Sequence, residues 1–154
     1  MPLTPFHLGP ALLLGLIFFS FLDFPTFLVA NVIVDFKPIL VMFLDLNYPL
    51  HGFFHLFLGG TLVALLLAFV MNKIRGKFST LLRFFKLEQK SSFRSILLAS
   101  LSGVYVHILL DSRMHTDIRP FYPLDFNPFL SSSTLPRLWV HMLCVWCFMG
   151  AAVV

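Results

Sequence analysis

The chain has 154 residues, of which 58% are hydrophobic and 12% charged, and its mean hydropathy is +0.90. This composition is too apolar for an ordinary soluble domain and indicates an integral membrane protein, with residues 1–154 forming a single membrane domain. The formal net charge of +4 arises mainly from Lys and Arg in one connecting segment, so we expect no nucleic-acid partner.

The first helix is expected over residues 10–22, which is short for a full span of about 20 residues. Residues 24–46 are apolar but contain Asp35, Lys37 and Pro38. Because Pro38 lacks a backbone donor and disfavours helix at the residue before it, we expect a half-helix to about Asp35, a break, and a short second piece. A break at membrane depth is tolerated where it lines a cavity, and Asp35 is expected to point into that cavity.

Residues 53–71 form the clearest predicted span, in which Gly59, Gly60 and Ala64 allow close helix packing. A segment rich in Lys and Arg follows over residues 72–94. Such a segment marks the cytoplasmic side, and its Phe84–Phe85 pair predicts an amphipathic stretch on the membrane surface, where anionic lipids can bind.

Two further spans are expected over residues 95–110 and 138–154. Between them, the Pro, Asp, Ser and Arg of residues 112–136 predict an irregular loop on the extracytoplasmic side. The predicted fold is therefore an all-α polytopic membrane bundle of about four spans plus a half-helix or re-entrant segment. Its expected location is the inner or plasma membrane of the cell.

Two pairs of potential metal ligands have an i, i+4 spacing, His51 with His55 in HGFFH and His107 with Asp111 in HILLD. On a helix, such side chains project from one face about one turn apart, close enough to share a cation. An ionisable side chain at the centre of a bilayer costs roughly 2.5 to 3.5 kcal/mol on insertion scales, so a group of them is expected to serve a function.

His7 and Asp35 reach the same predicted depth, on the extracytoplasmic side, if the N-terminus lies outside. The complete set of candidate ligands is His7, Asp35, His51, His55, His107 and Asp111. Imidazole and carboxylate ligands suit a divalent metal, with zinc as the first choice and manganese or iron as alternatives, and six ligands allow two metals. The competing interpretation is that the histidines only hydrogen-bond between helices.

The order of the motifs HLG, VDFKP, HGFFH and HILLD, the last followed by DIRPFYPL, resembles the YdjM-like family of predicted membrane-bound metal-dependent hydrolases. The correspondence runs from His7 to Pro123. It implies that the six candidate ligands are the functional residues of a membrane-bound hydrolase. Lys37 departs from the family pattern, which has a second acid at that position, and this removes one possible ligand or general base.

A cation held by these groups would acidify a bound water and polarise an ester or phosphoryl oxygen. The leading hypothesis is therefore a hydrolase of a lipid or phosphoester substrate with its site facing outside, in which Asp35 and Asp111 are the candidate catalytic residues.

Arg113, Arg119 and Lys37 are candidate contacts for a phosphate of the substrate, because Arg presents a fork of donors that suits phosphate oxygens. The alternative for the two arginines is a salt-bridged loop in which they pair with Asp117 and Asp125.

A second hypothesis is a divalent-metal transport or sensing protein of the membrane that uses the same ligands. Transporters often contain broken helices in two repeated halves, whereas this chain has one broken segment and no repeat, so a pathway would need a homo-oligomer. A third hypothesis is a structural membrane protein. Cys144 and Cys147 lie in the last apolar span and are expected to pack there, and His141 is expected to hydrogen-bond between helices.

Overall fold

The computed structural model describes residues 4–48, 50–131 and 134–154. Its helices are, in chain order, η1 (Thr4–His7), α1 (Leu8–Ile17), α2 (Phe24–Ile33), α3 (Phe36–Phe43), η2 (Phe53–His55), α4 (Phe57–Ile74), η3 (Arg75–Phe78), α5 (Ser79–Phe84), α6 (Phe93–Met114) and α7 (Thr134–Ala151). No strand occurs among the described residues. The predicted all-α class is confirmed.

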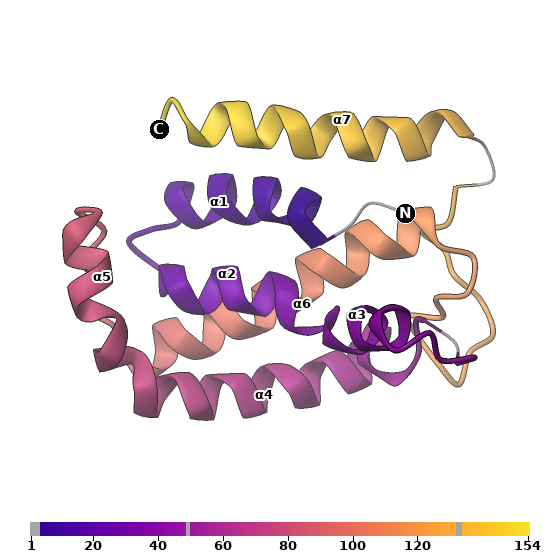
Figure 1. The fold of residues 1–154 in the computed structure, drawn as a ribbon, viewed down its shortest axis with the longest axis horizontal. Coiled ribbons are helices and arrows are strands. Elements are labelled where there is room, and N and C mark those ends of the chain that lie inside the picture. Colours follow the sequence, from indigo (N-terminus) through magenta and orange to yellow (C-terminus); the bar gives the residue numbers. More distant parts are fainter. Residues whose placement is uncertain (1–3, 49, 132–133) are drawn as a thin grey trace.

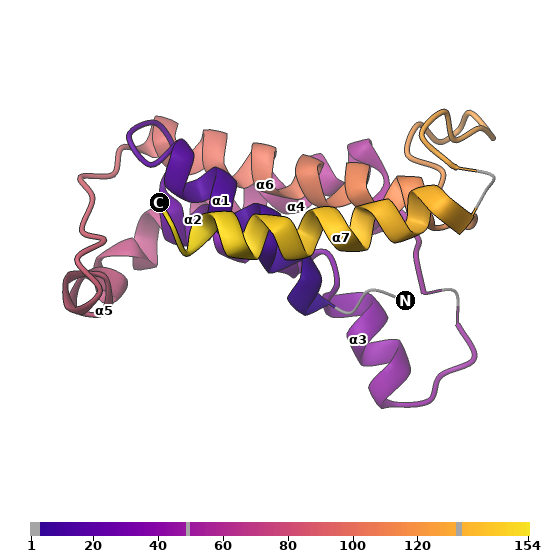
Figure 2. The same cartoon turned by 90° about the horizontal axis from the view of Figure 1, so that it is seen from above.

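The long helices lie roughly along one direction and form a layered bundle (Figure 1). Helix α6 packs against α2 and α4, and α1 packs between α2 and α7. Helix α3 projects from the side of this bundle, and α5 turns away from the end of α4 (Figure 2). The chain therefore has one bundle with two short helices attached at opposite ends.

Two to three helical segments are long and apolar enough to cross a membrane, as expected for a membrane protein. The segments Phe57–Phe84 and Phe93–Met114 qualify alone, and α2 with α3 qualifies as a pair bent by 45°. The helices Leu8–Ile17 and Leu138–Ala151 are apolar but shorter.

The break between α2 and α3 confirms the predicted half-helix. Helix α2 ends at Ile33, Asp35 follows at the break, and Pro38 lies in the first turn of α3. In a first turn the backbone N–H groups have no intrahelical partner, so the missing donor of Pro38 costs little there. The proline thus fixes where the second helix begins rather than where the first one ends.

Three predicted boundaries were wrong. The first helix ends at Ile17 instead of residue 22, because Asp23 caps α2 through an extended backbone (ψ 107°) and the chain must reverse before it. Helix α6 runs from Phe93 to Met114, beyond the predicted 95–110, because a capping box of Ser92 and Ser95 starts it.

The third wrong boundary concerns the loop predicted over residues 112–136. This loop is shorter than expected, because α6 continues to Met114 and α7 starts at Thr134. Pro136 lies in the first turn of α7, where proline is tolerated. Residues 132 and 133 of the predicted loop lie outside the described residues.

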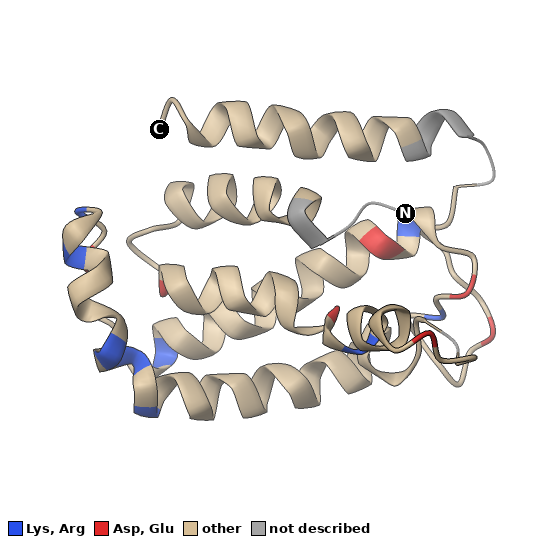
Figure 3. Ribbon diagram, viewed as in Figure 1, with Lys and Arg blue, Asp and Glu red and all other residues tan. Residues whose placement is uncertain are grey.

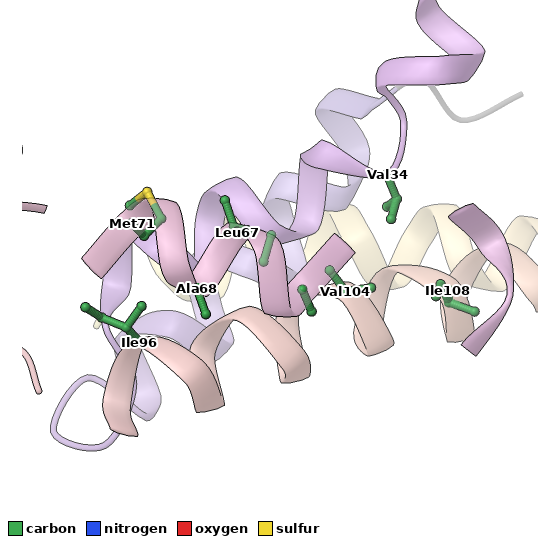
Figure 4. Packing of buried hydrophobic residues seen from close by; sticks show 9 residues of the cluster. Val34, Leu67, Ala68, Met71, Ile96, Val104 and Ile108 are labelled. Atoms are coloured by element: carbon green, nitrogen blue, oxygen red, sulfur yellow. The ribbon is translucent and has the colours of Figure 1, made fainter. Parts of the chain in front are cut away.

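The apolar core lies where α4 and α6 meet α2 (Figure 4). Its buried members are Ala30, Val34, Ala64, Leu67, Ala68, Met71, Ile96, Val104 and Ile108. Helix α4 can approach α6 closely because Gly60 has no side chain, since a Cβ there would lie 2.5 Å from Ile108 Cδ1. The prediction that small residues of this span serve close packing is confirmed at Gly60 and Ala64.

Charged residues are separated along the bundle. Lys and Arg gather at the end that carries α5, and most Asp lie at the opposite end, around α3 and the loop after α6 (Figure 3). Within the basic segment, α5 buries Leu82 and exposes Phe84, which agrees with the predicted amphipathic stretch. The acidic end is where the candidate ligands meet.

Candidate metal centre

Four buried side chains from three separate parts of the chain converge at the acidic end. Asp35 comes from the break between α2 and α3, His55 from the end of η2, and His107 and Asp111 from successive turns of α6. One ligand atom from each of the four lies within 4.8 Å of the others. This buried group of His and Asp can hold a metal ion.

The distances among these atoms suit a single cation. His107 Nε2 lies 3.2 Å from Asp35 Oδ1 and 3.2 Å from Asp111 Oδ2. His55 Nε2 lies 3.5 Å from each of the same two oxygens. Two ligand atoms of a tetrahedral zinc site are about 3.4 Å apart when the bonds are about 2.0 to 2.1 Å long. The donor set therefore fits a zinc-sized ion in both chemistry and spacing.

The orientation of the His107 ring supports this interpretation. Its Nδ1 lies 2.7 Å from the backbone carbonyl oxygen of Asn31, which can only accept, so Nδ1 donates the hydrogen bond. In the neutral ring, Nε2 then presents a lone pair to two carboxylates. Buried Nε2 atoms of His107 and His55 have no hydrogen-bond partner of good geometry within the described part of the chain. A bound cation would satisfy both nitrogen atoms and both carboxylates.

His7 lies at the edge of the four-residue group. It immediately precedes α1, its Nε2 lies 3.1 Å from Asp111 Oδ1, and its ring is 4.4 Å from that of His107, centroid to centroid. It therefore faces Oδ1 of Asp111, whereas His55 and His107 face Oδ2, and it is not one of the four converging donors.

The prediction that each i, i+4 pair lies on one face of a helix was wrong for His51 and His55 and is confirmed for His107 and Asp111. The HGFFH segment is not α-helical: His51 lies in a bend, and His55 ends the single turn of η2. The two rings nevertheless pack edge to face with centroids 4.8 Å apart. His51 is directed instead to Asp117, whose Oδ2 lies 2.8 Å from His51 Nδ1.

Sequence reasoning missed His115 and Asp117 as candidate site residues. The His115 ring lies 4.3 Å from that of His51, and Asp117 is the hydrogen-bond partner of His51. Burial lowers the pKa of His115 below its usual value. Partial burial raises the pKa of Asp117, but the hydrogen bond from His51 outweighs this effect and holds that pKa below its usual value. The signal that could have found them is the HTD triplet of residues 115–117, in which His115 follows Asp111 at an i, i+4 spacing.

The three predicted phosphate contacts lie in different surroundings. Arg119 forms an exposed ion pair with Asp125, as the salt-bridge alternative predicted. Arg113 has no carboxylate partner in the part of the chain that the structure describes, because Asp117 pairs with His51. Of the two arginines, Arg113 is thus the one without a carboxylate partner among the described residues, and it is well placed for an anionic ligand.

Lys37 lies near the bend that carries His51. A Cβ on Gly52 would lie 2.8 Å from Lys37 Nζ, and the same Nζ lies 5.2 Å from the centre of the Tyr48 ring. The side chain that replaces the second acid of the family pattern is thus directed toward the segment of residues 48–52.

The two cysteines of the last helix pack there as expected. Cys144 is a buried free thiol that packs with Met114 and Val140, and Cys147 is a half-buried free thiol. His141 packs against the ring of Phe6 with centroids 5.8 Å apart. Of the six histidines of the chain, His141 is the one that belongs to none of the contacts described above around Asp111 and His51.

The chain matches no family model, no curated protein and no solved structure.

Proposed function

We propose that the protein is a membrane-embedded metal-dependent hydrolase that acts on a lipid or other phosphoester substrate. The observation that carries the proposal is the convergence of Asp35, His55, His107 and Asp111 in a buried position. When bound there, a divalent cation such as zinc would supply a Lewis acid and a water of lowered pKa. The resemblance of the motif order to the YdjM-like family supports the same activity.

The chain's own groups have distinct roles in this proposal. The Asn31 carbonyl holds the His107 ring with Nε2 directed at the two carboxylates. The side chain of Asp35 is 10% exposed and that of Asp111 is 4% exposed. A general base must reach the proton that it removes from water, so Asp35 is the better placed of the two to accept it. Asp111, deeper in the bundle, holds the ligand histidines in position.

The proposed arrangement in the membrane has the basic end on the cytoplasmic side and the metal site on the extracytoplasmic side. It is supported by the separation of Lys and Arg from the acidic end (Figure 3) and by the positive-inside rule. Large apolar side chains on α4 and α7 are exposed, which suits contact with lipid tails; they include Leu58, Leu62, Leu66, Phe69, Trp139 and Trp146. In this arrangement α1, α4, α6 and α7 are four spans and α2 with α3 is the broken segment.

A lipid substrate is supported by a groove between α6 and α7. The groove has a volume of about 530 Å³, and it is lined by Leu110, Arg113, Trp139, Val140, Leu143 and Trp146. Arg113 lines this groove, so its guanidinium can bind a phosphate there while the apolar walls bind an acyl chain.

The test is metal analysis of the detergent-purified protein by mass spectrometry, followed by turnover of phosphoester lipids. We expect wild type to retain zinc, manganese or iron and a His55→Ala, Asp111→Ala double variant to lose it. His141→Ala is the matched control, because His141 packs on Phe6 outside the ligand group, and it should keep both metal and turnover. Absence of a transition metal from wild type after reloading with zinc would refute the proposal.

Divalent-metal transport is the second candidate, and the break that places Asp35 at the ligand group favours it. Broken helices at membrane depth bind coupling ions in many transporters. Zinc flux into proteoliposomes separates the two functions: flux without lipid turnover would support transport, and turnover without flux supports the hydrolase.

A further inference from the structure

We propose that the protein binds a second divalent cation between His51, His115 and Asp111, so that the carboxylate of Asp111 bridges two cations. One ligand atom from each of these residues lies within 4.8 Å of the others. The proposal rests on the proposed function, because Asp111 also belongs to the four-residue group. It adds a site that includes His115, which follows Asp111 at an i, i+4 spacing but lies outside the four motifs of the sequence analysis.

His51 is held in the state that binds metals. The Asp117 carboxylate can only accept, so His51 Nδ1 donates the 2.8 Å hydrogen bond and Nε2 keeps its lone pair. A histidine that binds a metal through one ring nitrogen usually donates the N–H of its other ring nitrogen to a carboxylate, carbonyl or water. This hydrogen bond fixes both the tautomer and the orientation of the ring. The side chain of Asp117 is 49% exposed, whereas that of His51 is 4% exposed, so the ligand is inside and its partner outside.

His115 is placed by the end of α6. Its backbone N–H donates to the carbonyl oxygen of Asp111 at 2.9 Å, and its extended backbone turns the chain out of the helix there. The following loop is tied back to the start of α4, because the N–H of Phe57 donates to the Pro120 carbonyl oxygen at 2.9 Å. These two contacts bring the His115 ring to 4.3 Å from that of His51. Asp111 lies one helical turn before His115, so the end of α6 places its carboxylate beside the two rings.

The two carboxylate oxygens of Asp111 have different neighbours. Its Oδ2 faces His55 and His107, whereas Oδ1 lies 3.1 Å from His7 Nε2 without hydrogen-bond geometry. The described residues provide no other hydrogen bond to that buried oxygen. A carboxylate with one oxygen on each side is the common bridge between two metal ions in hydrolases.

A two-cation centre suits a phosphoester substrate. Two cations can stabilise both the attacking and the leaving oxygen of an in-line displacement at phosphorus. A cavity of about 360 Å³ lies next to the second site, and Gly52, Asp117 and Arg119 are among the residues that line it. None of the three proposed ligands lines this cavity, so the phosphate is assigned to Arg113 in the groove between α6 and α7.

The test counts metal ions in zinc-reloaded protein and records electron paramagnetic resonance after reloading with Mn²⁺. Wild type and the His141→Ala control should bind two zinc ions per chain and give the spectrum of a coupled manganese pair. His115→Ala should bind one zinc ion and give the six-line spectrum of an isolated Mn²⁺. Asp117→Asn keeps the His51 ring in place and should weaken only the second zinc ion, by about 10- to 100-fold.

The outcomes separate this proposal from the preceding one. One zinc ion in wild type, unchanged in His115→Ala and Asp117→Asn, would overturn the second site and leave the first intact. Loss of both ions in Asp117→Asn would also overturn it, because that substitution touches no ligand of the first group. No zinc in wild type would overturn the proposed function itself.

Discussion

His107 donates from Nδ1 to the backbone carbonyl oxygen of Asn31 at 2.7 Å. This contact depends on the break between α2 and α3. The last four carbonyl groups of a helix have no intrahelical partner. Asn31 lies in the last turn of α2, which ends at Ile33, so its carbonyl is free to accept from His107. The break therefore supplies one ligand, Asp35, and orients another, and both consequences follow from ending α2 at this point.

The contact between α2 and α6 requires a glycine one turn before His107. A Cβ on Gly103 would lie 2.6 Å from the Cβ of Ala30 and 2.9 Å from the Phe27 carbonyl oxygen. We predict that Gly103→Ala forces the two helices apart, lowers the free energy of unfolding by about 1 to 3 kcal/mol, and weakens zinc binding. Thermal unfolding in detergent and zinc titration measure the two effects.

Gly76→Ala is the matched control for this substitution. No other atom lies within 4 Å of the position that its Cβ would occupy, so both stability and zinc affinity should stay close to those of wild type. If Gly103→Ala and Gly76→Ala behaved alike, the close approach of α2 to α6 would not be what positions His107.

Removal of the metal should destabilise the protein. The carboxylates of Asp35 and Asp111 share the neighbours His55 and His107 in a buried site, and only the folded chain brings these four groups together. A cation that binds them therefore stabilises the folded state by mass action. At a free concentration of 100 times Kd this amounts to about 2.7 kcal/mol. We expect a chelator to lower the Tm and zinc to restore it. The His55→Ala, Asp111→Ala variant should show no response to either, and a zinc response in that variant would locate the stabilising ion elsewhere.

The part of the site on regular helix could be predicted from the sequence. The apolar run around HILLD fixes a helix, and a helix places His107 and Asp111 on one face whatever else the chain does. The break was equally local, because Pro38 is compatible with a first turn and not with a helix interior. In both cases the backbone geometry alone determined where the side chains lie.

The part of the site on irregular segments could not be predicted in this way. His51 and His55 were expected on one helix, yet His51 lies in a bend and His55 ends a single 3-10 turn. Their approach to Asp111 depends on contacts distant in sequence. His115 comes beside His51 because the loop after α6 is hydrogen-bonded to the start of α4. Tertiary contacts of this kind leave no periodic pattern in the sequence.

Asp23 is predicted to stabilise the basic end of the bundle without affecting the metal site. It is buried at 1% exposure and accepts from Thr26 Oγ1 at 2.6 Å, from Arg75 Nε at 2.5 Å and from the Ser91 hydroxyl. Removing one partner of a buried ion pair costs about 3 to 5 kcal/mol, so Asp23→Ala should strongly lower the Tm. Zinc stoichiometry of the protein that remains folded should equal that of wild type.

The ion pair of Arg83 with Glu88 provides the comparison for Asp23. Its side chains are 73% and 56% exposed at an N–O distance of 3.2 Å, and exposed pairs contribute about 0 to 1 kcal/mol. Glu88→Ala should therefore leave the Tm nearly unchanged. A loss of zinc from folded Asp23→Ala protein would show that the two ends of the bundle are coupled.

Arg113 and Arg119 should differ in their effect on turnover, although they are only six residues apart in the sequence. Arg113 lines the apolar groove beside Trp139 and Trp146, whereas Arg119 is paired with Asp125. If Arg113 binds the phosphate of a substrate whose acyl chain lies in the groove, Arg113→Ala should raise KM for a long-chain phosphoester lipid. Loss of a charge-assisted hydrogen bond of about 1.5 to 3 kcal/mol corresponds to a rise in KM of roughly 10- to 100-fold.

Two controls accompany this prediction. Arg119→Ala should change KM little. A short-chain soluble phosphoester, which cannot fill the groove, should bind weakly to wild type and Arg113→Ala alike. An equal rise in KM for both substitutions would place the phosphate between the two arginines, in the cavity beside Asp117, rather than at the mouth of the groove.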